Sequence, residues 1–161
     1  MGFKELFEMQ KHLNDRIIQE HGLHNDNLYD HRLLALLVEL GELANETRCF
    51  KYWSVKPASS DSVILEEYVD GLHFILSVGL DMGMDDIEIH AVASNEDLTG
   101  QFLSLYRLIS GLQGKKDKTL FSQLFSEFIG LGQLLGFSVE NIVDGYYKKN
   151  EINHQRQDEG Y

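Results

Sequence analysis

The chain has 161 residues, of which 43% are hydrophobic and 25% charged, a composition typical of one globular domain. Its 26 acidic residues exceed its 14 basic residues and give a net charge of −12, so no nucleic-acid partner is expected. No stretch approaches the roughly 20 apolar residues that span a bilayer, and the N-terminus lacks a secretory signal, so no membrane partner is expected. The single cysteine, Cys49, excludes an internal disulfide framework and favours the cytoplasm.

The first half of the chain has apolar residues mostly at the helical spacing of about 3.6 residues. This periodicity predicts helices over residues 3–21, 28–48 and 62–82. The stretch 53–61 contains the only proline, Pro57, and is predicted to be a loop.

The second half begins with residues 84–94, where apolar and polar side chains alternate and the backbone could be extended. Three later residues can cap a fourth, a fifth and a sixth helix: Asn95, Asp117 and Ser138. Two glycines stand where the fourth and fifth helices should end: Gly114 and Gly136. No repeat or inter-domain linker is visible. The sequence thus predicts a single all-α domain over 1–161, a bundle of about six helices.

The second predicted helix carries the sequence VELGELANE at 38–46. Glu39 and Glu42 are three residues apart and share a helix face, and Glu46 lies four residues further on. All three fall beside the leucine stripe of this helix. Carboxylates gathered on one strip repel each other unless a cation lies among them.

The third predicted helix carries ILEEYVDGLHFILSVG at 64–79, with Glu67 and Asp70 also three residues apart. This helix is apolar on two sides, which is typical of a buried helix. Charged groups on a buried helix must be paired or bound to metal. Either acidic pair alone would be interpreted as a solvated surface, but two such pairs on successive helices favour a metal site.

The metal that these ligands favour is Mg²⁺, which binds hard oxygen ligands and bridges carboxylates to substrate phosphates. Di-iron helical bundles instead use Glu-x-x-His pairs. Neither Glu39 nor Glu67 has a histidine three residues later, so Mg²⁺ is preferred to iron.

The first predicted helix places Gln10 and Asn14 four residues apart in the middle of its apolar face. The two carboxamides offer donors and acceptors that suit the O2, N3–H and O4 edge of uracil. A single buried amide would be interpreted as a core hydrogen bond, whereas two on one stripe favour a base pocket. Phe74 lies one turn after Asp70, where its ring could stack on a base or simply fill the core.

The C-terminal sequence YYKKNEINHQRQDEGY, 146–161, is basic within an acidic protein. Lys149, Asn153 and Arg156 recur at helical spacing and form one strip, which suits phosphate oxygens. The alternative is a solvated terminal helix.

These motifs together resemble the dimeric dUTPases, within the superfamily of all-α NTP pyrophosphohydrolases that includes the MazG-like proteins. The resemblance rests on the E-x-x-E and E-x-x-D pairs, on MQKHLNDRI at 9–17, on DGLHF at 70–74, on RCFKYWS at 48–54 and on the C-terminal run. It extends over nearly the whole chain, although residues 84–137 contain no assigned motif.

The resemblance implies hydrolysis of dUTP to dUMP and pyrophosphate, which limits uracil incorporation into DNA and supplies dUMP. It implies more than one Mg²⁺ per site, held by four carboxylates: Glu39, Glu42, Glu67 and Asp70. Glu39 is the expected general base, and attack is expected at the β-phosphorus, with dUDP as a further substrate. The implied substrate-binding residues are Gln10, Asn14, Trp53, Phe74, Lys149, Asn153, Arg156 and Tyr161. A homodimer is also implied.

Two alternatives remain open at this point. The first is a MazG-like house-cleaning pyrophosphohydrolase that acts on another nucleoside triphosphate, because base choice depends on the shape of the pocket. The second is a non-catalytic helical protein that binds a nucleotide or a partner. No histidine, serine or cysteine nucleophile is expected, and His73 is interpreted as structural.

Overall fold

The computed structural model describes residues 3–24, 26–93 and 97–161. It contains six helices: α1 (Lys4–His21), α2 (Tyr29–Thr47), α3 (Asp61–Asp81), α4 (Leu98–Gly111), α5 (Lys118–Leu134) and α6 (Val139–Asp158). The described residues form no β-sheet, so the predicted all-α fold is confirmed. None of these helices is long and apolar enough to cross a membrane.

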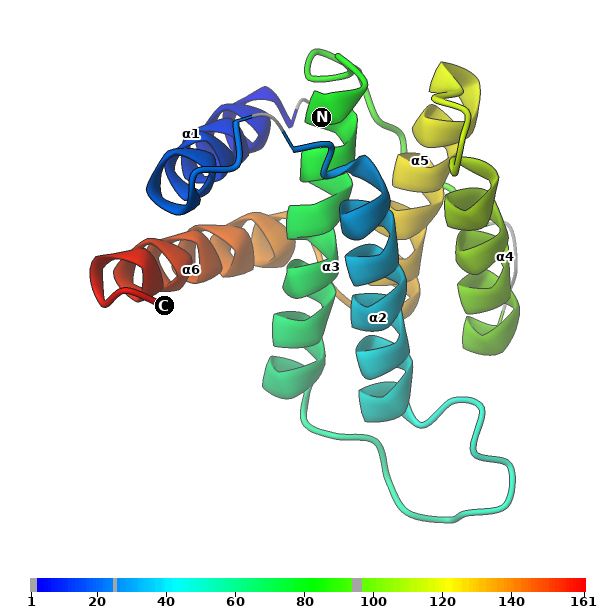
Figure 1. Ribbon diagram of the computed structural model, residues 1–161. Helices are drawn as coiled ribbons and strands as arrows, with labels where there is room; N and C mark the ends of the chain where they lie inside the picture. The colour runs from blue at the N-terminus through cyan, green and yellow to red at the C-terminus, as the bar shows by residue number, and fades with distance from the viewer. Residues whose placement is uncertain (1–2, 25, 94–96) are drawn as a thin grey trace.

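The central helix is α3, which packs against α1, α2, α5 and α6. Figure 1 shows α2, α3, α4 and α5 running alongside one another, with α1 and α6 lying across α3. The sequence explains this position, because α3 buries side chains on most of its circumference, including Tyr68, Leu72 and Leu76. As expected from its two apolar sides, α3 places Glu67 and Asp70 in a half-buried setting.

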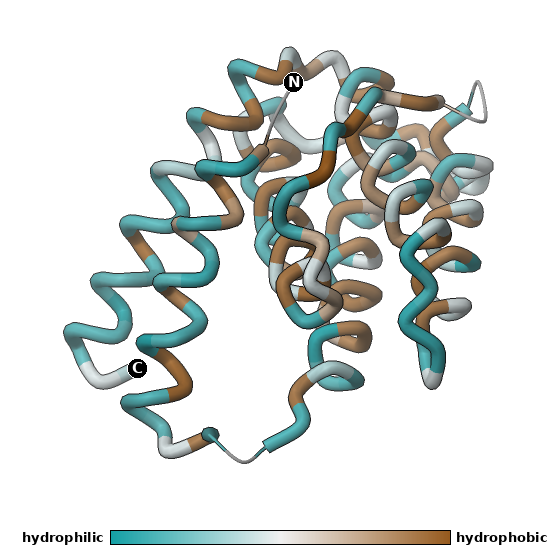
Figure 2. The backbone as a smooth tube through the Cα atoms, turned by 90° about the horizontal axis from the view of Figure 1, so that it is seen from above, coloured by the Kyte–Doolittle hydropathy of each residue, from teal (hydrophilic) through white to brown (hydrophobic). Residues whose placement is uncertain are grey.

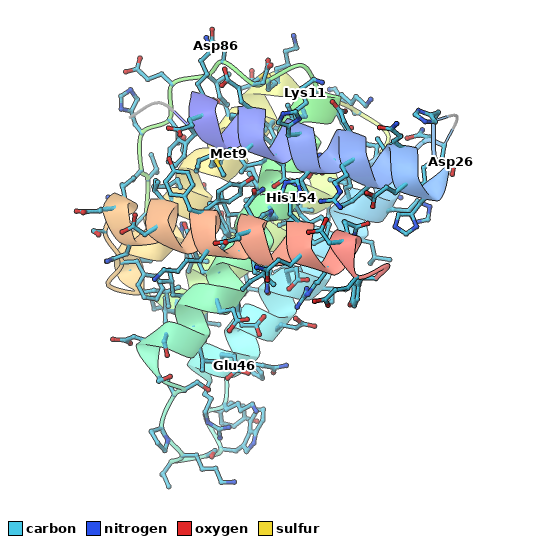
Figure 3. All side chains as sticks on the ribbon, turned by 90° about the vertical axis from the view of Figure 1, so that its left-hand side faces the viewer. Met9, Lys11, Asp26, Glu46, Asp86 and His154 are labelled. Atoms are coloured by element: carbon cyan, nitrogen blue, oxygen red, sulfur yellow. The ribbon has the colours of Figure 1, made fainter. Side chains whose placement is uncertain are left out.

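The helices α1 and α6 form a second layer over α3 and run parallel to each other. Near its start α1 meets Tyr146, and near its end Arg16 donates to the Asp158 carboxylate at 2.5 Å. Figure 2 shows that hydrophobic stretches are concentrated among the four aligned helices, whereas the α1–α6 layer alternates with hydrophilic residues. Figure 3 shows the two helices side by side, with His154 between them and Glu46 near the lower end of α2.

The caps of the later helices agree in part with the sequence prediction. Asp117 and Ser138 cap α5 and α6, and Ser138 forms a capping box with Asn141. The cap of α4 is Asp97, whose carboxylate accepts from the Gly100 amide, and not Asn95, which lies outside the described residues. The cap comes later than predicted because Asp97 is itself a strong N-cap residue adjoining the apolar run.

The predicted helix ends are close to those observed. Gly114 and Gly136 follow α4 and α5 by three and two residues, with φ of +71° and +87°, a conformation that glycine adopts without strain. Residues 84–93 are not helical, and the Val92 amide donates to the Ser126 carbonyl of α5. The helical alternative is therefore excluded for the described part of this segment.

Candidate active site

Three carboxylates meet where α2 and α3 pack together. One oxygen each of Glu39, Glu67 and Asp70 lies within 4.8 Å of the other two. The acids meet because each pair is spaced by three residues and so shares one face of its helix, and the two faces adjoin. This cluster is called the acidic cluster below.

The two remaining glutamates of α2 lie at the edge of the acidic cluster. Glu42 is exposed, but its carboxylate is close enough to Glu39 and Glu67 to raise the pKa of both. Glu46 instead accepts a hydrogen bond from the Ser59 hydroxyl, in the loop before α3. Of the three glutamates on α2, Glu46 alone has a hydrogen-bonding partner other than a carboxylate among the described residues.

Burial and mutual repulsion make these carboxylates hard to ionise. Burial, followed by the charges of Asp70 and Glu42, raises the pKa of Glu39 to about 8. The same causes raise the pKa of Glu67 to about 7. Burial also raises the pKa of Asp70, although Lys149 opposes this shift. The site thus has a deficit of positive charge.

The nearest positive charge is the Lys149 ammonium of α6. Its Nζ atom lies 2.9 Å from Asp70 Oδ1 and 3.5 Å from Glu66 Oε1. Burial lowers the pKa of Lys149, but the hydrogen bond and the charge of Asp70 raise it above its ordinary value. Lys149 therefore stays protonated beside the acidic cluster.

A divalent cation fits these donors. Glu39 Oε2 and Glu67 Oε2 are buried and have no hydrogen-bond partner among the described residues. A buried carboxylate oxygen without a partner is costly, and a hard cation would satisfy both atoms. The sequence prediction that Glu39, Glu67 and Asp70 lie together is therefore met by the geometry.

A pocket of about 480 Å³ opens beside the acidic cluster, between α1, α2, α3 and α6. Eight residues named in the sequence analysis line its wall: Gln10, Asn14, His73, Phe74, Lys149, Asn153, Arg156 and Tyr161. Glu39 and Asp70 form part of the same wall. The pocket thus brings together motifs from both ends and the middle of the chain.

The amides of α1 lie deep in this wall. Gln10 is only 3% exposed, and its Nε2 donates to Asn14 Oδ1 at 2.9 Å. Two aliphatic side chains of α1, Leu13 and Ile17, line the pocket beside them. This end of the pocket combines apolar surface with a pair of oriented amides, which suits a planar, polar-edged ring.

The C-terminal strip lines another part of the wall. Asn153 and Arg156 follow Lys149 along α6, and the Arg156 guanidinium lies 5.3 Å from the centre of the Tyr161 ring. This contact holds the chain end against the pocket through a cation–π interaction. Cationic and amide groups on this side suit an anionic ligand.

A comparison with protein families bears on the alternatives left open by the sequence. A family model described as dUTPase matches residues 2–161, nearly the whole chain. The chain belongs to the dUTPase family. No curated protein sequence matches it. Family membership makes it a dUTP diphosphatase, and the non-catalytic alternative is set aside.

One residue that the dUTPase resemblance implied does not line this pocket. Trp53 lies in the loop between α2 and α3, is 64% exposed and packs edge-on against Phe50 and Tyr52. Figure 1 shows this loop projecting away from the helices. A role for Trp53 in binding dUTP therefore stays a prediction.

The sequence did not identify several other residues in the wall of the dUTPase pocket: His31, Arg32, Ser77 and Gln157. Arg32 donates to Asp81 at 2.6 Å. A sequence signal did exist for it, since Arg32 lies seven residues before Glu39 and so shares its helix face. His73, interpreted as structural, is buried and stacks on Tyr146, and burial lowers its pKa to about 3.

Proposed function

We propose that this dUTPase hydrolyses dUTP to dUMP and pyrophosphate in a Mg²⁺-dependent reaction centred on Glu39, Glu42, Glu67 and Asp70. The observation that supports this best is the acidic cluster, whose two buried carboxylate oxygens lack a partner at the edge of the pocket. Glu42 belongs to the proposed ligands because its carboxylate adjoins Glu39 and Glu67.

The proposed hydrolysis uses carboxylate-bound Mg²⁺ and Glu39 as the general base. Bound Mg²⁺, with more than one ion per site, would screen the triphosphate, assist ionisation of water and stabilise the departing phosphate. Glu39 accepts the proton of the attacking water. The water oxygen forms a bond to the β-phosphorus while the bond from that phosphorus to the α,β-bridging oxygen breaks. The bridging oxygen leaves with dUMP, and the attacking oxygen remains in pyrophosphate.

The uracil ring and the deoxyribose of dUTP are assigned to the α1 side of the pocket. Gln10 and Asn14 hydrogen-bond the edge of uracil, and Phe74, one turn beyond Asp70 on α3, packs against the ring or the deoxyribose. The position of all three in the wall of one pocket supports this assignment.

The phosphates are assigned to the α6 side. Lys149, Asn153 and Arg156 contact the phosphate chain, and Tyr161 helps to close the pocket over it. Their shared place on the wall, within reach of Asp70, supports the assignment. Because dUDP has a β-phosphorus too, it is a further proposed substrate.

The cellular role proposed is removal of dUTP, which limits uracil incorporation into DNA and supplies dUMP. We also propose a cytoplasmic homodimer. The single cysteine fits a reducing compartment. Exposed apolar side chains on α2, Leu34 and Val38, fit a subunit interface.

The test is pyrophosphate release from dUTP, dTTP, dCTP and UTP, with Mg²⁺ and with EDTA, by the wild type and by Glu39→Gln. The expected result is Mg²⁺-dependent turnover confined to deoxyuridine substrates and lowered by at least about a hundredfold in Glu39→Gln. Comparable turnover of several bases would contradict the uracil pocket and favour a MazG-like enzyme of broader range. Full activity in EDTA would contradict the metal site.

A further inference from the structure

Four hydrogen bonds form a continuous chain behind the base end of the pocket. The Tyr146 hydroxyl donates to Gln10 Oε1 at 2.8 Å. Gln10 Nε2 donates to Asn14 Oδ1 at 2.9 Å, and Asn14 Nδ2 donates to Ser77 Oγ at 3.1 Å. Ser77 Oγ donates to the His73 carbonyl at 2.9 Å. The chain links α6, α1 and α3 through five residues.

The His73 carbonyl, the last acceptor, fixes the direction of all four hydrogen bonds. A backbone carbonyl can only accept, so Ser77 donates its one hydroxyl hydrogen to the His73 carbonyl at 2.9 Å in preference to Asn14 Oδ1, which lies 3.4 Å away. Ser77 Oγ is then left to accept, which turns the NH₂ group of Asn14 towards it. The oxygen of Asn14 consequently faces Gln10.

The donors and acceptors at the Tyr146 end of this series of hydrogen bonds are fixed in the same way. Because Asn14 presents its oxygen, Gln10 must present its NH₂ group to Asn14 and its oxygen to Tyr146. Tyr146 then donates to Gln10 Oε1 at 2.8 Å, and the Leu6 carbonyl, at 3.4 Å, is the more distant acceptor. Burial raises the pKa of Tyr146 well above its ordinary value, so the hydroxyl keeps the proton that it donates.

The hydrogens and lone pairs that remain unused have a definite pattern. Gln10 retains one N–H and one lone pair on the oxygen that faces Tyr146, and Asn14 retains one N–H and one lone pair on its oxygen. In the order Gln10 N–H, Asn14 oxygen and Asn14 N–H, these groups run donor, acceptor, donor, the complement of the acceptor–donor–acceptor edge of uracil, O2, N3–H and O4. Cytosine also presents two acceptors and one donor, but in the order acceptor–acceptor–donor, so it matches this order poorly.

We propose that Tyr146 is a positioning residue for base selection, which holds the amides of Gln10 and Asn14 in the orientation that accepts uracil and rejects cytosine. Tyr146 is fully buried and is not part of the pocket wall, so it acts through Gln10 and does not touch the substrate. This inference rests on the proposed uracil-reading role of the two amides.

If Tyr146 only stabilised the fold, its loss would not change the preference for dUTP over dCTP. Another buried tyrosine of the protein provides a matched control. Tyr68 is also fully buried, and its hydroxyl donates to the Phe128 carbonyl at 2.7 Å, away from the amides. Tyr68→Phe therefore makes the same chemical change, with loss of one buried hydrogen bond, but leaves the chain of donors intact. A general loss of stability would affect both variants alike.

The experiment measures kcat/KM for dUTP and for dCTP with Mg²⁺ in the wild type, Tyr146→Phe and Tyr68→Phe. We expect Tyr146→Phe to lower the dUTP to dCTP ratio by about tenfold, the effect of one hydrogen bond, through slower dUTP turnover and unchanged or faster dCTP turnover. Tyr68→Phe is expected to keep the wild-type ratio. An unchanged ratio in Tyr146→Phe, including an equal fall in kcat/KM for both substrates, overturns the proposal.

A second variant guards against failure of Tyr146→Phe to fold. Ser77→Ala breaks the chain at its other end, and Ser104→Ala removes a buried hydroxyl that instead donates to Glu127 at 2.6 Å. The ratio should fall in Ser77→Ala and stay constant in Ser104→Ala. If Tyr146→Phe does not fold, an unchanged ratio in Ser77→Ala overturns the proposal.

Gln10→Ala separates this inference from the proposed function. If Gln10→Ala lowers the ratio but neither Tyr146→Phe nor Ser77→Ala does, only the positioning role is overturned. If Gln10→Ala and Asn14→Ala both leave the ratio unchanged, the uracil-reading assignment itself is wrong, and the positioning role is overturned with it.

Discussion

At the scale of single residues, Lys149 supplies a positive charge to carboxylates that would otherwise repel each other. Its ammonium contacts Asp70, one of the proposed metal ligands, and has Glu66 as a second acceptor outside the acidic cluster. A cation that binds Asp70 must therefore compete with this ion pair. The same lysine is proposed to contact phosphate, so metal binding and release of Lys149 are expected to be linked.

Lys149→Gln is expected to bind Mn²⁺ several-fold more tightly than the wild type when no nucleotide is present, because it lacks the competing ammonium. It should also bind a non-hydrolysable dUTP analogue more weakly. Calorimetric titration measures both affinities, and Lys148→Gln, the same charge change at the exposed neighbouring position, is the control. Weaker Mn²⁺ binding by Lys149→Gln would contradict the competition.

The raised pKa values of Glu39 and Glu67 predict how stability depends on pH. Since these values lie above the ordinary 4.5, the folded protein holds protons that the unfolded chain has released. These two groups therefore stabilise the metal-free protein at low pH, and their contribution is lost as the pH rises towards about 8.

Thermal unfolding in EDTA should therefore show a melting temperature that falls by a few degrees between about pH 6 and pH 8.5. Glu39→Gln should reduce this fall, because the substituted side chain does not ionise, and Mg²⁺ should restore the wild type at the higher pH. Glu140→Gln, on the exposed first turn of α6, is the control. Identical pH profiles for the wild type and Glu39→Gln would show that the Glu39 carboxylate is not under this repulsion.

The sequence predicted which carboxylates lie together where helix spacing alone decides which face they share. Glu39, Glu67 and Asp70 are the clearest case, because three-residue spacing on two adjoining helices leaves few alternatives. The partners of Gln10 were beyond reach, since Tyr146 lies 136 residues further along the chain. Only the packing of α6 on α1 brings the two together.

At the scale of elements, the first three helices were predicted to within one residue at each end, because apolar periodicity extends through them. The loop after α2 is different. Its conformation depends on few packed contacts, so neither its spacing nor its composition could place Trp53. In the structure this side chain faces solvent, away from the pocket that it was expected to border.

Trp53 is the only tryptophan, so intrinsic fluorescence reports directly on this loop. If the loop covers bound nucleotide, dUMP with Mg²⁺ should shift Trp53 emission to shorter wavelength, because the exposed ring would leave water. Trp53→Phe should raise KM for dUTP several-fold, and dCMP at the same concentration is the control ligand. Constant emission on addition of dUMP, with an unchanged KM in Trp53→Phe, would remove Trp53 from the site.

At the scale of the whole molecule, the single chain completes a pocket but leaves apolar surface exposed. Leu34 and Val38, one turn apart on α2, are 63% and 51% exposed. The sequence predicted the all-α class and the approximate helix number, since these follow from periodicity. It could not predict which helix faces are left without a partner, because that depends on how the six helices pack.

The proposed homodimer predicts a light-scattering mass of twice the chain mass of 18.5 kDa. Leu34→Asp combined with Val38→Asp should shift the protein towards the monomer, because burial of each aliphatic side chain contributes about 1.5–3 kcal/mol. Val55→Asp, at an exposed apolar position in the loop after α2, should leave the dimer intact. A wild type that stays monomeric at all concentrations would contradict the proposal.

The most direct test of the central claim is to titrate metal-free protein with Mn²⁺ and follow ion occupancy and pyrophosphate release from dUTP in the same samples. The proposed function predicts that turnover rises in step with occupancy, and that Glu67→Gln loses both. The control is Glu66→Gln on the same helix, outside the acidic cluster, which should bind the ion and retain turnover. Release of pyrophosphate at zero occupancy, or full occupancy in Glu67→Gln, would contradict the assignment of these carboxylates.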